Sequence, residues 1–579
     1  MVDDRPDRLP IIVGVTGHRD LDLRPEFDAA LRAAVDAIFE RLAREYPATP
    51  LLLLTPLAEG ADRLVAEVAR ARAIPYRVPL PMPLEDYRED FADGPSRDAF
   101  DALAAGAQTP PYTIARETSD AAVLASGAPG PARRAEAYAE VGAHLVRSCH
   151  VLIALWDGMP SDAVGGTAQV VSFRVLGLPQ HLTHRSILDE PDVGPVHHIY
   201  AARAHRGRPA RPVGTCMLRV RGDVDPNARG FDAIDERENA ADPFVVLYAR
   251  IEAFNRDCLC YPAPKSATES EAATSRMRAV AECLASHYQR KAGAALVRLF
   301  GATAVAGIIF VSYADLFPAL HVLVIPYILA LVVAVTTFVR ADRGRWQDRA
   351  QDYRALELGL SVQRVWDAVG LRESVAEYYV ARQRTELDWI PQAIGAVHTL
   401  DLWLPFDEAA GIAAVRAFLS NQYAYFAGTN GRAGVAVRED RRRARYDALR
   451  RWALRAGFIA SAALVAFALS AWFRPDLYGE ADTIETWHGR LIFTIGIAAV
   501  AAALCNDYVE RRGFREHAER YAMMAGIYRR ALSVLDDSTR SPLETARAVI
   551  SEVGHEALTE NGDWILLHRA RPIELLQIA

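Results

Sequence analysis

The chain of 579 residues carries a formal net charge of −7, because 73 acidic residues outnumber 66 basic ones. This balance argues against a protein whose main partner is a nucleic-acid backbone, since such proteins need a net basic surface. Hydrophobic residues make up 51% of the chain and charged residues 24%, which predicts apolar segments set in a charge-rich remainder. The first ten residues, MVDDRPDRLP, lack the basic and apolar runs of a signal peptide, so none is expected.

Three short apolar runs in the N-terminal part predict β-strands. They are IIVGV (11–15), LLLL (51–54) and HVLIALW (150–156), and each leads into a glycine-bearing turn and a segment of helical periodicity. Strand, turn and helix in this repeated order predict a Rossmann-like α/β domain with a parallel sheet. Ligands bind such sheets beyond the carboxyl ends of the strands, so the turns are the expected binding site.

The turn after the third run has the features of a phosphate site. Gly165 and Gly166 would let the backbone approach a ligand without a Cβ clash, and Thr167 is placed to cap the next helix. Free N–H groups at a helix start favour a phosphate. The turn TGHR (16–19) would form a second wall of the same site. The alternative is that these glycines only close the connections between strands and helices.

Four longer apolar runs predict membrane-spanning helices. They cover residues 299–314, 319–339, 456–473 and 491–505. A helix needs about 20 residues to cross a hydrocarbon core of about 30 Å, which the second run provides by itself and the others approach with their flanks. The alternative is four buried helices in a large soluble core.

The distribution of basic residues favours the membrane. The flanks at 276–298, 340–354, 438–455 and 508–530 carry 5, 5, 8 and 6 Lys or Arg, whereas the connector 312–321 carries none. Because positive flanks stay in the cytoplasm, we expect two helical hairpins, with both termini cytoplasmic, in the inner membrane of a bacterium.

The two hairpins also resemble each other. A shift of 168 residues aligns DRGRWQDRAQDYRALELGL (342–360) with ERRGFREHAERYAMMAGIY (510–528). The matched pairs are Arg343 and Arg511, Trp346 and Phe514, Ala350 and Ala518, and Tyr353 and Tyr521. An internal repeat is therefore expected, with long helices at 346–452 between its halves.

Cysteine usage predicts neither a disulfide scaffold nor a metal site. The chain has six cysteines, and Cys258 and Cys260 lack the CxxC spacing of a zinc site. We expect no metal and no cofactor other than a nucleotide-type ligand.

Four motifs occur in order in the N-terminal part: GVTGHRD (14–20), LAEGAD (57–62), YAEVGAHLVRSCHVLIALWDG (138–158) and GGTAQVV (165–171). Together they resemble the SLOG superfamily of Rossmann-like nucleotide-binding domains over about 11–220. The resemblance implies a nucleotide site made by Gly17, His18, Arg19, Glu59, Gly60, Asp62, Asp157, Gly165, Gly166 and Thr167.

One position departs from the enzymes of that superfamily. Its phosphoribohydrolases carry a PGGxGTxxE motif whose glutamate takes part in glycosidic cleavage, and here Val170 stands at that place. We therefore expect a protein without catalytic residues, although Glu59 or Asp62 could supply an acid. Their plain roles would be a solvated surface carboxylate and a helix cap.

The membrane half resembles the SLATT group of two-helix membrane modules over about 285–535. The segments that carry the resemblance are YRALELGLSVQRVWDAVG (353–370) and VRAFLSNQYAYF (415–426). Members of that group are proposed to form pores that kill or arrest an infected cell. The resemblance thus implies a membrane effector.

These observations predict six consecutive regions. They are a SLOG-like domain (1–250), a linker (251–290), a first SLATT-like transmembrane hairpin with a cytoplasmic helix (291–380), a helical cytoplasmic connector (381–450), a second hairpin with a cytoplasmic helix (451–540) and a C-terminal tail (541–579).

The functional hypothesis is a homo-oligomeric membrane effector of bacterial antiphage defence. A nucleotide second messenger would bind the SLOG-like domain and trigger pore opening or membrane disruption, and thereby growth arrest; the bilayer is the second partner, and no nucleic-acid polymer is expected. Two alternatives stay open: a membrane-anchored nucleotide or NAD N-glycosidase, and a nucleotide-regulated housekeeping channel.

Overall fold

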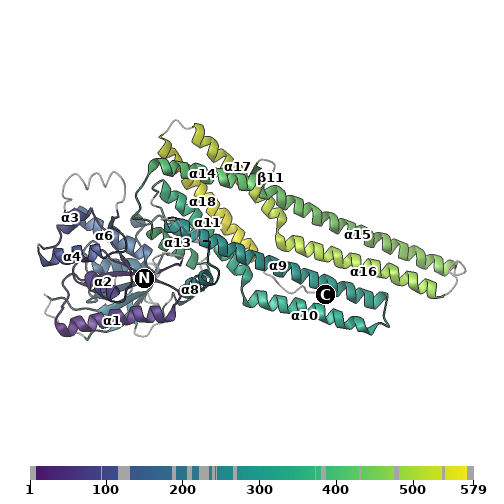
Figure 1. Ribbon diagram of the computed structural model, residues 1–579, viewed down its shortest axis with the longest axis horizontal. Coiled ribbons are helices and arrows are strands. Elements are labelled where there is room, and N and C mark those ends of the chain that lie inside the picture. The colour runs from purple at the N-terminus through teal and green to yellow at the C-terminus, as the bar shows by residue number, and fades with distance from the viewer. Residues whose placement is uncertain are drawn as a thin grey trace. The chain divides into compact units, whose positions relative to one another are not determined.

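The chain folds into two compact units. The computed structural model describes residues 8–569 except 93, 115–130, 186–188, 190, 205–211, 221–233, 238–241, 243, 265–269, 271, 372, 380–386, 430–431, 475–480 and 538–540. Unit 1 comprises residues 1–284 and 356–406, and unit 2 comprises residues 285–355 and 407–579 (Figure 1). The segment 356–406, which the sequence assigned to the first hairpin module and the helical connector, thus groups with the N-terminal residues.

Unit 1 is built on a seven-stranded sheet of order β3-β2-β1-β6-β7-β8-β9. The strands are β1 (Ile11–Gly17), β2 (Leu51–Leu54), β3 (Tyr76–Arg77), β6 (Val151–Trp156), β7 (Val196–Tyr200), β8 (Thr215–Val220) and β9 (Ile234–Arg237). The first five are parallel, whereas β8 and β9 add antiparallel pairs at one edge. The predicted α/β class is confirmed as a mixed, mainly parallel sheet; its antiparallel edge was not expected.

Helices cover the sheet because its central strands are apolar on both faces. All residues of β2 and β6 are buried, which is typical of a parallel strand enclosed by helices. The helices of this part are α1 (Pro25–Glu45), α2 (Ala61–Ala71), α3 (Leu84–Arg88), α4 (Pro95–Ala105), α6 (Pro131–Ser148), α7 (Thr167–Leu176) and the short η1 (Gln180–Leu182), with a small parallel pair β4 (Pro79–Leu80) and β5 (Tyr112–Thr113). Helices α1 and α2 pack together, as do α6 and α7.

Helix α8 (Val245–Cys260) closes the N-terminal end of the sheet with buried polar side chains. The amide of Asn255 accepts from the backbone N–H of Leu9 at 2.8 Å and donates to its carbonyl at 2.9 Å. The carboxylate of Glu252 accepts from the Thr49 hydroxyl at 2.7 Å. The two Asn255 bonds satisfy the backbone groups of Leu9, just before β1, that no strand pairs.

The segment 356–406 completes unit 1. It includes the end of α11 (Trp346–Ala368), α12 (Val375–Tyr378) and α13 (Trp389–Thr399), and α13 packs on α6 and α8. The indole of Trp389 lies 5.9 Å from the ring of Phe254. The carboxylate of Glu377 accepts from the backbone N–H of His184 at 2.6 Å.

This segment also caps a helix that belongs to both units. Helix α9 (Ala273–Asp315) starts in unit 1 and ends in unit 2. The Asp401 carboxylate accepts from the backbone N–H groups of Ala273 at 2.7 Å and Thr274 at 2.8 Å. Since a carboxylate at a helix start satisfies free N–H groups and opposes the dipole, Asp401 fixes where α9 begins.

Unit 2 is helical and contains the four predicted apolar helices. Its elements are the end of α9, η4 (His321–Leu323), α10 (Val324–Arg343), the start of α11, α14 (Glu408–Ala427), β10 (Gly428–Thr429), β11 (Arg432–Ala433), α15 (Val435–Phe473), α16 (Ala481–Arg512), α17 (Phe514–Asp537) and α18 (Pro542–Arg569). In the described part of the chain, four helices are long and apolar enough to cross a membrane, as the sequence predicted; they lie at Ala273–Asp315, His321–Ala368, Val435–Phe473 and Ile484–Asp537.

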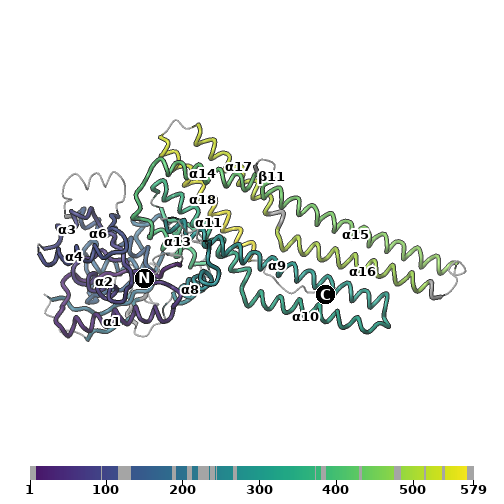
Figure 2. Tube along the Cα trace, viewed as in Figure 1, coloured from purple at the N-terminus to yellow at the C-terminus, as the bar shows by residue number. Residues whose placement is uncertain are grey.

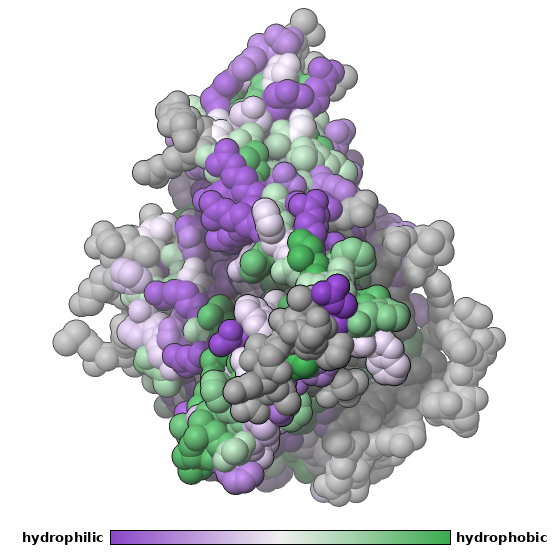
Figure 3. All heavy atoms as spheres, turned by 90° about the vertical axis from the view of Figure 1, so that its right-hand side faces the viewer, coloured by the Kyte–Doolittle hydropathy of each residue, from purple (hydrophilic) through white to green (hydrophobic). Residues whose placement is uncertain are grey.

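Many large apolar side chains of these helices are exposed. Ile325 is 67% exposed, Leu329 62% and Phe458 78%, although each lies in an apolar span. The face drawn in Figure 3 shows hydrophobic side chains, in green, at the surface. Such exposure in water would favour aggregation, and a lipid environment removes that cost. The exposure of these side chains favours membrane-spanning helices over four helices buried in a soluble core, because in such a core these residues would be buried.

Helix α16 lies beside both α9 and α15. Small residues allow the close approach: a Cβ on Gly307 or Gly496 would meet Val500 or Val311 on the opposite helix. Helices α15 and α16 run side by side over most of their length (Figure 2). Close packing at small residues is how helices associate where lipid leaves no hydrophobic driving force.

In each half of the expected internal repeat, a break between two consecutive helices lies at the same position of the repeat. Arg345, between α10 and α11, has φ 48°, and Gly513, between α16 and α17, has φ 57°. These two residues are 168 positions apart in the sequence, and the next helices begin directly after them, at Trp346 and Phe514. The shared left-handed break, rare for a residue such as arginine, supports the repeat expected from the sequence.

The end of the chain completes unit 2. Helices α14, α17 and α18 pack on one another, and Phe426 stacks on Tyr528 with ring centroids 5.7 Å apart. One face of α18 buries Ile550, Val553 and Ile565. Residues 542–569 of the expected C-terminal tail are therefore part of a folded bundle.

Asn255 provides a test of how unit 1 is held together. We expect Asn255→Ala to lower the free energy of unfolding by on the order of 3 kcal/mol, because it leaves the buried N–H and carbonyl of Leu9 without partners. Denaturant unfolding of the purified chain measures this loss. Val246→Ala, at an exposed position of the same helix, should change stability by less than about 0.5 kcal/mol; equal losses would contradict the assignment.

Candidate functional site

The expected site lies where the direction of strand order changes. Strand β1 has β2 on one side and β6 on the other, and the chain reaches β6 only after completing the β2 side. In open parallel sheets, ligands bind at this switch point, beyond the carboxyl ends of the strands. Gly17 ends β1 and Asp157 follows β6 directly, so both expected residues lie at this edge.

His18 and Asp157 connect the ends of β1 and β6. The backbone N–H of Asp157 donates to Nε2 of His18 at 3.1 Å. Burial lowers the pKa of His18, although the nearby Asp157 carboxylate opposes this shift. The same Nε2 lies 3.1 Å from a carboxylate oxygen of Asp157, so the imidazole faces both the backbone and the side chain of that residue. His18 is buried and holds the two turns together.

The chain after β1 crosses to the segment after β7. Leu21 forms an isolated bridge with Arg203, whose guanidinium also pairs with Asp20 at 2.9 Å. Since β6 lies between β1 and β7 in the sheet, this crossing covers the carboxyl end of β6. The accessible part of the edge therefore lies on the side of α2 and α6.

The start of α2 presses against the turn after β1. Gly60 has φ 76°, and a Cβ there would collide with the carbonyl oxygens of His18 and Arg19. A Cβ on Gly17 would collide with Ala61. Glycine is thus required at both positions for packing within the protein, whatever the ligand. The sequence pattern identified these residues, but their role in the structure is close approach of two backbones.

The GGT turn is built in a similar way. Gly165 has φ 74°, and a Cβ there would collide with Tyr138 of α6. The N–H of Gly165 donates to the Gln169 side chain at 2.6 Å, so it is already satisfied. The expected cap by Thr167 is wrong: Gly166 is the N-cap of α7 and Thr167 is the first helical residue, whose hydroxyl makes no cap bond.

Arg19 projects into the accessible side of the edge. It is exposed, and its guanidinium lies 5.0 Å from the centre of the Tyr138 ring. The Tyr138 hydroxyl and Arg134 both bond to the Asp90 carboxylate. Asp90 is thereby occupied by other partners, and among the described residues Arg19 makes no ion pair. Its charge is available to an anion.

Asp62 is a buried carboxyl group beside this arginine. Its Oδ2 accepts from the backbone N–H of Ala58 at 3.2 Å. Burial raises the pKa of Asp62 to about 7, although this hydrogen bond and the charge of Arg19 oppose the shift. Asp62 does not cap α2, because its bond runs to the preceding turn. A carboxyl group that is half protonated near neutral pH can donate or accept a proton from a ligand.

Two further polar groups near Asp62 have unused hydrogen-bonding capacity. The Tyr87 side chain is fully buried, and its hydroxyl has no hydrogen-bond partner in the described part of the chain. The Nη2 of Arg63 is also buried without a partner there. Buried polar groups without partners are uncommon in folded proteins and call for an explanation, such as an absent ligand or water.

Glu59 is tied to the same group of residues. Its carboxylate accepts from the Ser96 hydroxyl, and Arg63 donates to the Ser96 carbonyl at 2.8 Å. Glu59 is therefore a structural partner of α4 and not the freely solvated carboxylate that was the plain alternative. The geometry thus gathers Arg19, Asp62 and Arg63 around the start of α2.

Neither helix start at this edge has a side-chain cap. Gly60 precedes α2 and Gly166 precedes α7, and glycine has no side-chain oxygen to accept from the first N–H groups. At the start of α2, the N–H of Ala61 donates instead to the backbone carbonyl of His18 at 3.1 Å. Uncapped helix starts carry partial positive charge. Together with Arg19 they make the edge attractive to an anion such as a phosphate.

Several residues of this edge were missed by sequence reasoning. Tyr138 lies inside one of the quoted motifs and Arg63 directly follows another, so both could have been found. Tyr87 and Asp90 belong to no recognisable pattern, and only the fold brings them to Asp62 and Tyr138. In the described part of the chain, no group of three or more His, Cys, Asp and Glu residues is arranged to hold a metal ion.

Comparison of the chain with known protein families, with curated proteins and with solved structures found no match.

Asp62 should make stability depend on pH. It holds a proton in the folded chain up to about pH 7, whereas the unfolded chain releases it near pH 4. The folded state binds more protons between these values, so stability falls as pH rises through this window, by on the order of 4 kcal/mol from this group. Asp62→Asn cannot titrate and should remove the decline, measured by denaturant unfolding at pH 5 and pH 8. Asp98→Asn, at an exposed position, is the control and should keep the decline in stability. If Asp62→Asn loses as much stability between pH 5 and pH 8 as the parent chain, the raised pKa of Asp62 is contradicted.

Proposed function

We propose that the protein is a membrane effector controlled by a nucleotide that binds unit 1, as the resemblance to SLOG and SLATT modules implies. One observation carries this proposal. Among the described residues, an exposed arginine without an ion pair and two helix starts without a side-chain cap lie at one sheet edge, and four helices are long and apolar enough to cross a membrane. The sheet edge supplies an anion site, and the helices supply the membrane part.

Two helices offer a path for coupling between ligand and membrane. Helices α9 and α11 each have residues in both units. Unit 1 holds the start of α9 through Asp401, which lies in the segment 356–406. We propose that ligand binding shifts this segment and thereby α9 and α11. A ligand biases such an equilibrium only through different affinities for the two states.

The membrane arrangement that we propose is two hairpins with both termini in the cytoplasm of a bacterium. The rings of Phe310 and Tyr327 lie 6.1 Å apart, which brings α9 to α10, and α15 packs along α16. Basic residues flank the spans at one end, as the preference for positive cytoplasmic flanks requires. Four helices enclose at best a narrow lumen, so the pore would require a homo-oligomer. Its opening would arrest growth during phage infection.

A second function is favoured by one observation, the raised pKa of Asp62. A carboxyl group with a pKa of about 7 at a ligand site suits a general acid, which the N-glycosidase alternative needs. Incubation of the purified chain with adenine and guanine nucleotides distinguishes the two. Release of free base favours the glycosidase, and stoichiometric binding without product favours the effector.

Arg19 tests the nucleotide site. Nucleotides retained by the native chain are identified by mass spectrometry, and their affinity is measured by equilibrium dialysis. Arg19→Gln should weaken binding by about 10- to 100-fold, because a charged hydrogen bond contributes about 1.5–3 kcal/mol. Arg24→Gln is the matched control, since Arg24 is exposed near the same turn but pairs with Asp22 at 2.7 Å. Equal effects of both substitutions would place the site elsewhere.

The topology has a separate test that uses a native cysteine. Cys260 of unit 1 is exposed and should resist a membrane-impermeant thiol reagent in intact cells. Pro318→Cys, in the connector between α9 and η4, should be labelled from outside. Lysed cells provide the control in which both thiols react. Labelling of Cys260 in intact cells would contradict cytoplasmic placement of unit 1.

A further inference from the structure

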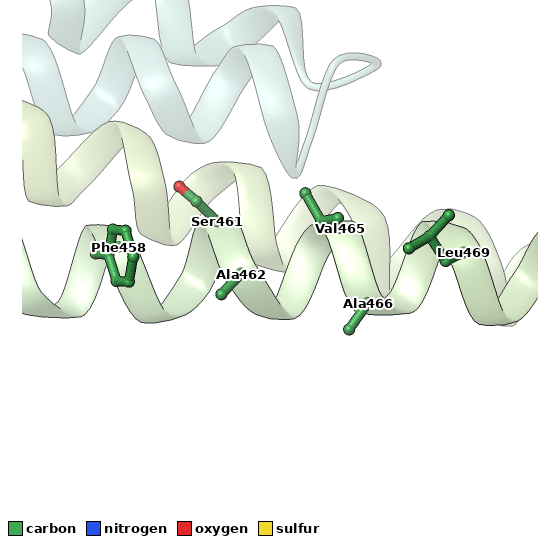
Figure 4. Close-up of a pocket in the computed structure, with 6 residues that line it drawn as sticks. All are labelled: Phe458, Ser461, Ala462, Val465, Ala466 and Leu469. Carbon is green, nitrogen blue, oxygen red and sulfur yellow. The ribbon is translucent and has the colours of Figure 1, made fainter.

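One face of α15 combines an apolar groove with exposed arginines. The groove is formed by Phe458, Ser461, Ala462, Val465, Ala466 and Leu469, all from this helix (Figure 4). Ser461, Val465 and Leu469 make one row at intervals of four residues, and Phe458, Ala462 and Ala466 make the other. The alanines keep the groove open because their side chains are short.

Arg451 and Arg455 continue this face toward the N-terminal end of the helix. The positions 451, 455, 458, 462, 466 and 469 follow one another at intervals of three or four residues, which places them on one side of an α-helix. Both arginines are exposed, and neither makes an ion pair in the described part of unit 2. The nearest acidic residue along this face, Asp447, is paired with Arg443 at 3.5 Å.

We propose that this face of α15 binds an anionic phospholipid of the bilayer. The phosphate would lie between the guanidinium groups of Arg451 and Arg455, and one acyl chain would lie in the groove. From position 455 to position 469 the helix rises about 21 Å, whereas one leaflet of the hydrocarbon core is about 15 Å deep. The groove is therefore long enough for an acyl chain that starts at the headgroup level.

Charge favours a lipid over a second copy of the chain as the occupant. Copies inserted in the same direction and related by a two-fold axis would bring their Arg451 and Arg455 side chains together. Asp447, the nearest carboxylate along this face, is already paired with Arg443 and would not offset the repulsion. A phospholipid instead places its negative charge beside the arginines and its apolar chain beside Phe458 and Leu469. Arginine stems at the end of a span reach headgroups in this way.

The test counts lipids bound to the purified full chain in detergent by native mass spectrometry. The probes are phosphatidylglycerol, which is anionic, and phosphatidylcholine, which is not. We expect preferential binding of phosphatidylglycerol. The pair Arg451→Gln and Arg455→Gln should weaken it by about 25-fold, about fivefold for each charge. The matched pair Arg441→Gln and Arg445→Gln, exposed on the same helix but farther from the apolar part, should change it by less than about twofold.

A second pair of variants tests the groove. Ala462→Leu with Ala466→Leu fills it and should displace phosphatidylglycerol, whereas Ala463→Leu with Ala468→Leu adds the same volume at exposed positions outside it. Unchanged phosphatidylglycerol binding after loss of Arg451 and Arg455, or equal binding of both lipids, would overturn the proposal. Groove substitutions that dissociate an oligomer without reducing lipid binding would assign the face to a second copy instead.

Discussion

The burial of residues 356–406 against the α/β domain is the interaction on which the organisation of this protein depends. This segment lies between two pairs of candidate membrane helices in the sequence, yet its helix α13 packs on α6 and α8. Through Asp401 it caps the start of α9, and through the end of α11 it is continuous with residues of unit 2. Unit 1 is thereby joined to unit 2 within α9, within α11 and again after residue 406, rather than by one linker.

The candidate site follows from a second constraint, the geometry of parallel strands. The carboxyl ends of β1, β2 and β6 share one edge, so turns that are far apart in sequence must meet there. Most of the glycines at this edge serve the packing of α2 and α6 against the turns. Within the described residues, three groups at this edge are not used up by that packing. They are Arg19, which makes no ion pair there, the Tyr87 hydroxyl, which has no hydrogen-bond partner there, and the Asp62 carboxyl, whose pKa is raised by burial.

The sequence allowed prediction of the features that depend on local pattern. The strands at 11–15, 51–54 and 150–156 and the four spans are continuous apolar runs, and the repeat break recurs at equivalent residues, Arg345 and Gly513. The docking of 356–406 was not predictable, because a buried helix face does not specify which apolar surface covers it. The roles of Tyr87 and Asp90 were also hidden, since only tertiary contacts bring them to Asp62 and Tyr138. The sequence pattern also predicted Thr167 as the N-cap of α7. In the structure the N-cap is Gly166, and Thr167 is the first residue of the helix.

The packing of α13 on α6 and α8 limits how a ligand bound to unit 1 could act on the membrane helices in the proposed effector. Trp389, Ile390, Ile394 and Val397 of α13 are each no more than 2% exposed. Exposing four such side chains would cost roughly 6–12 kcal/mol, and the cap of α9 would be lost as well. A ligand of micromolar affinity contributes about 8 kcal/mol in total, and only the part that differs between two states shifts an equilibrium. Complete release of the segment is therefore too costly for such a ligand. In the proposed effector, coupling would then proceed through a small displacement of α13 while it stays packed on α6 and α8, which would move the ends of α9 and α11 without exposing the core of unit 1.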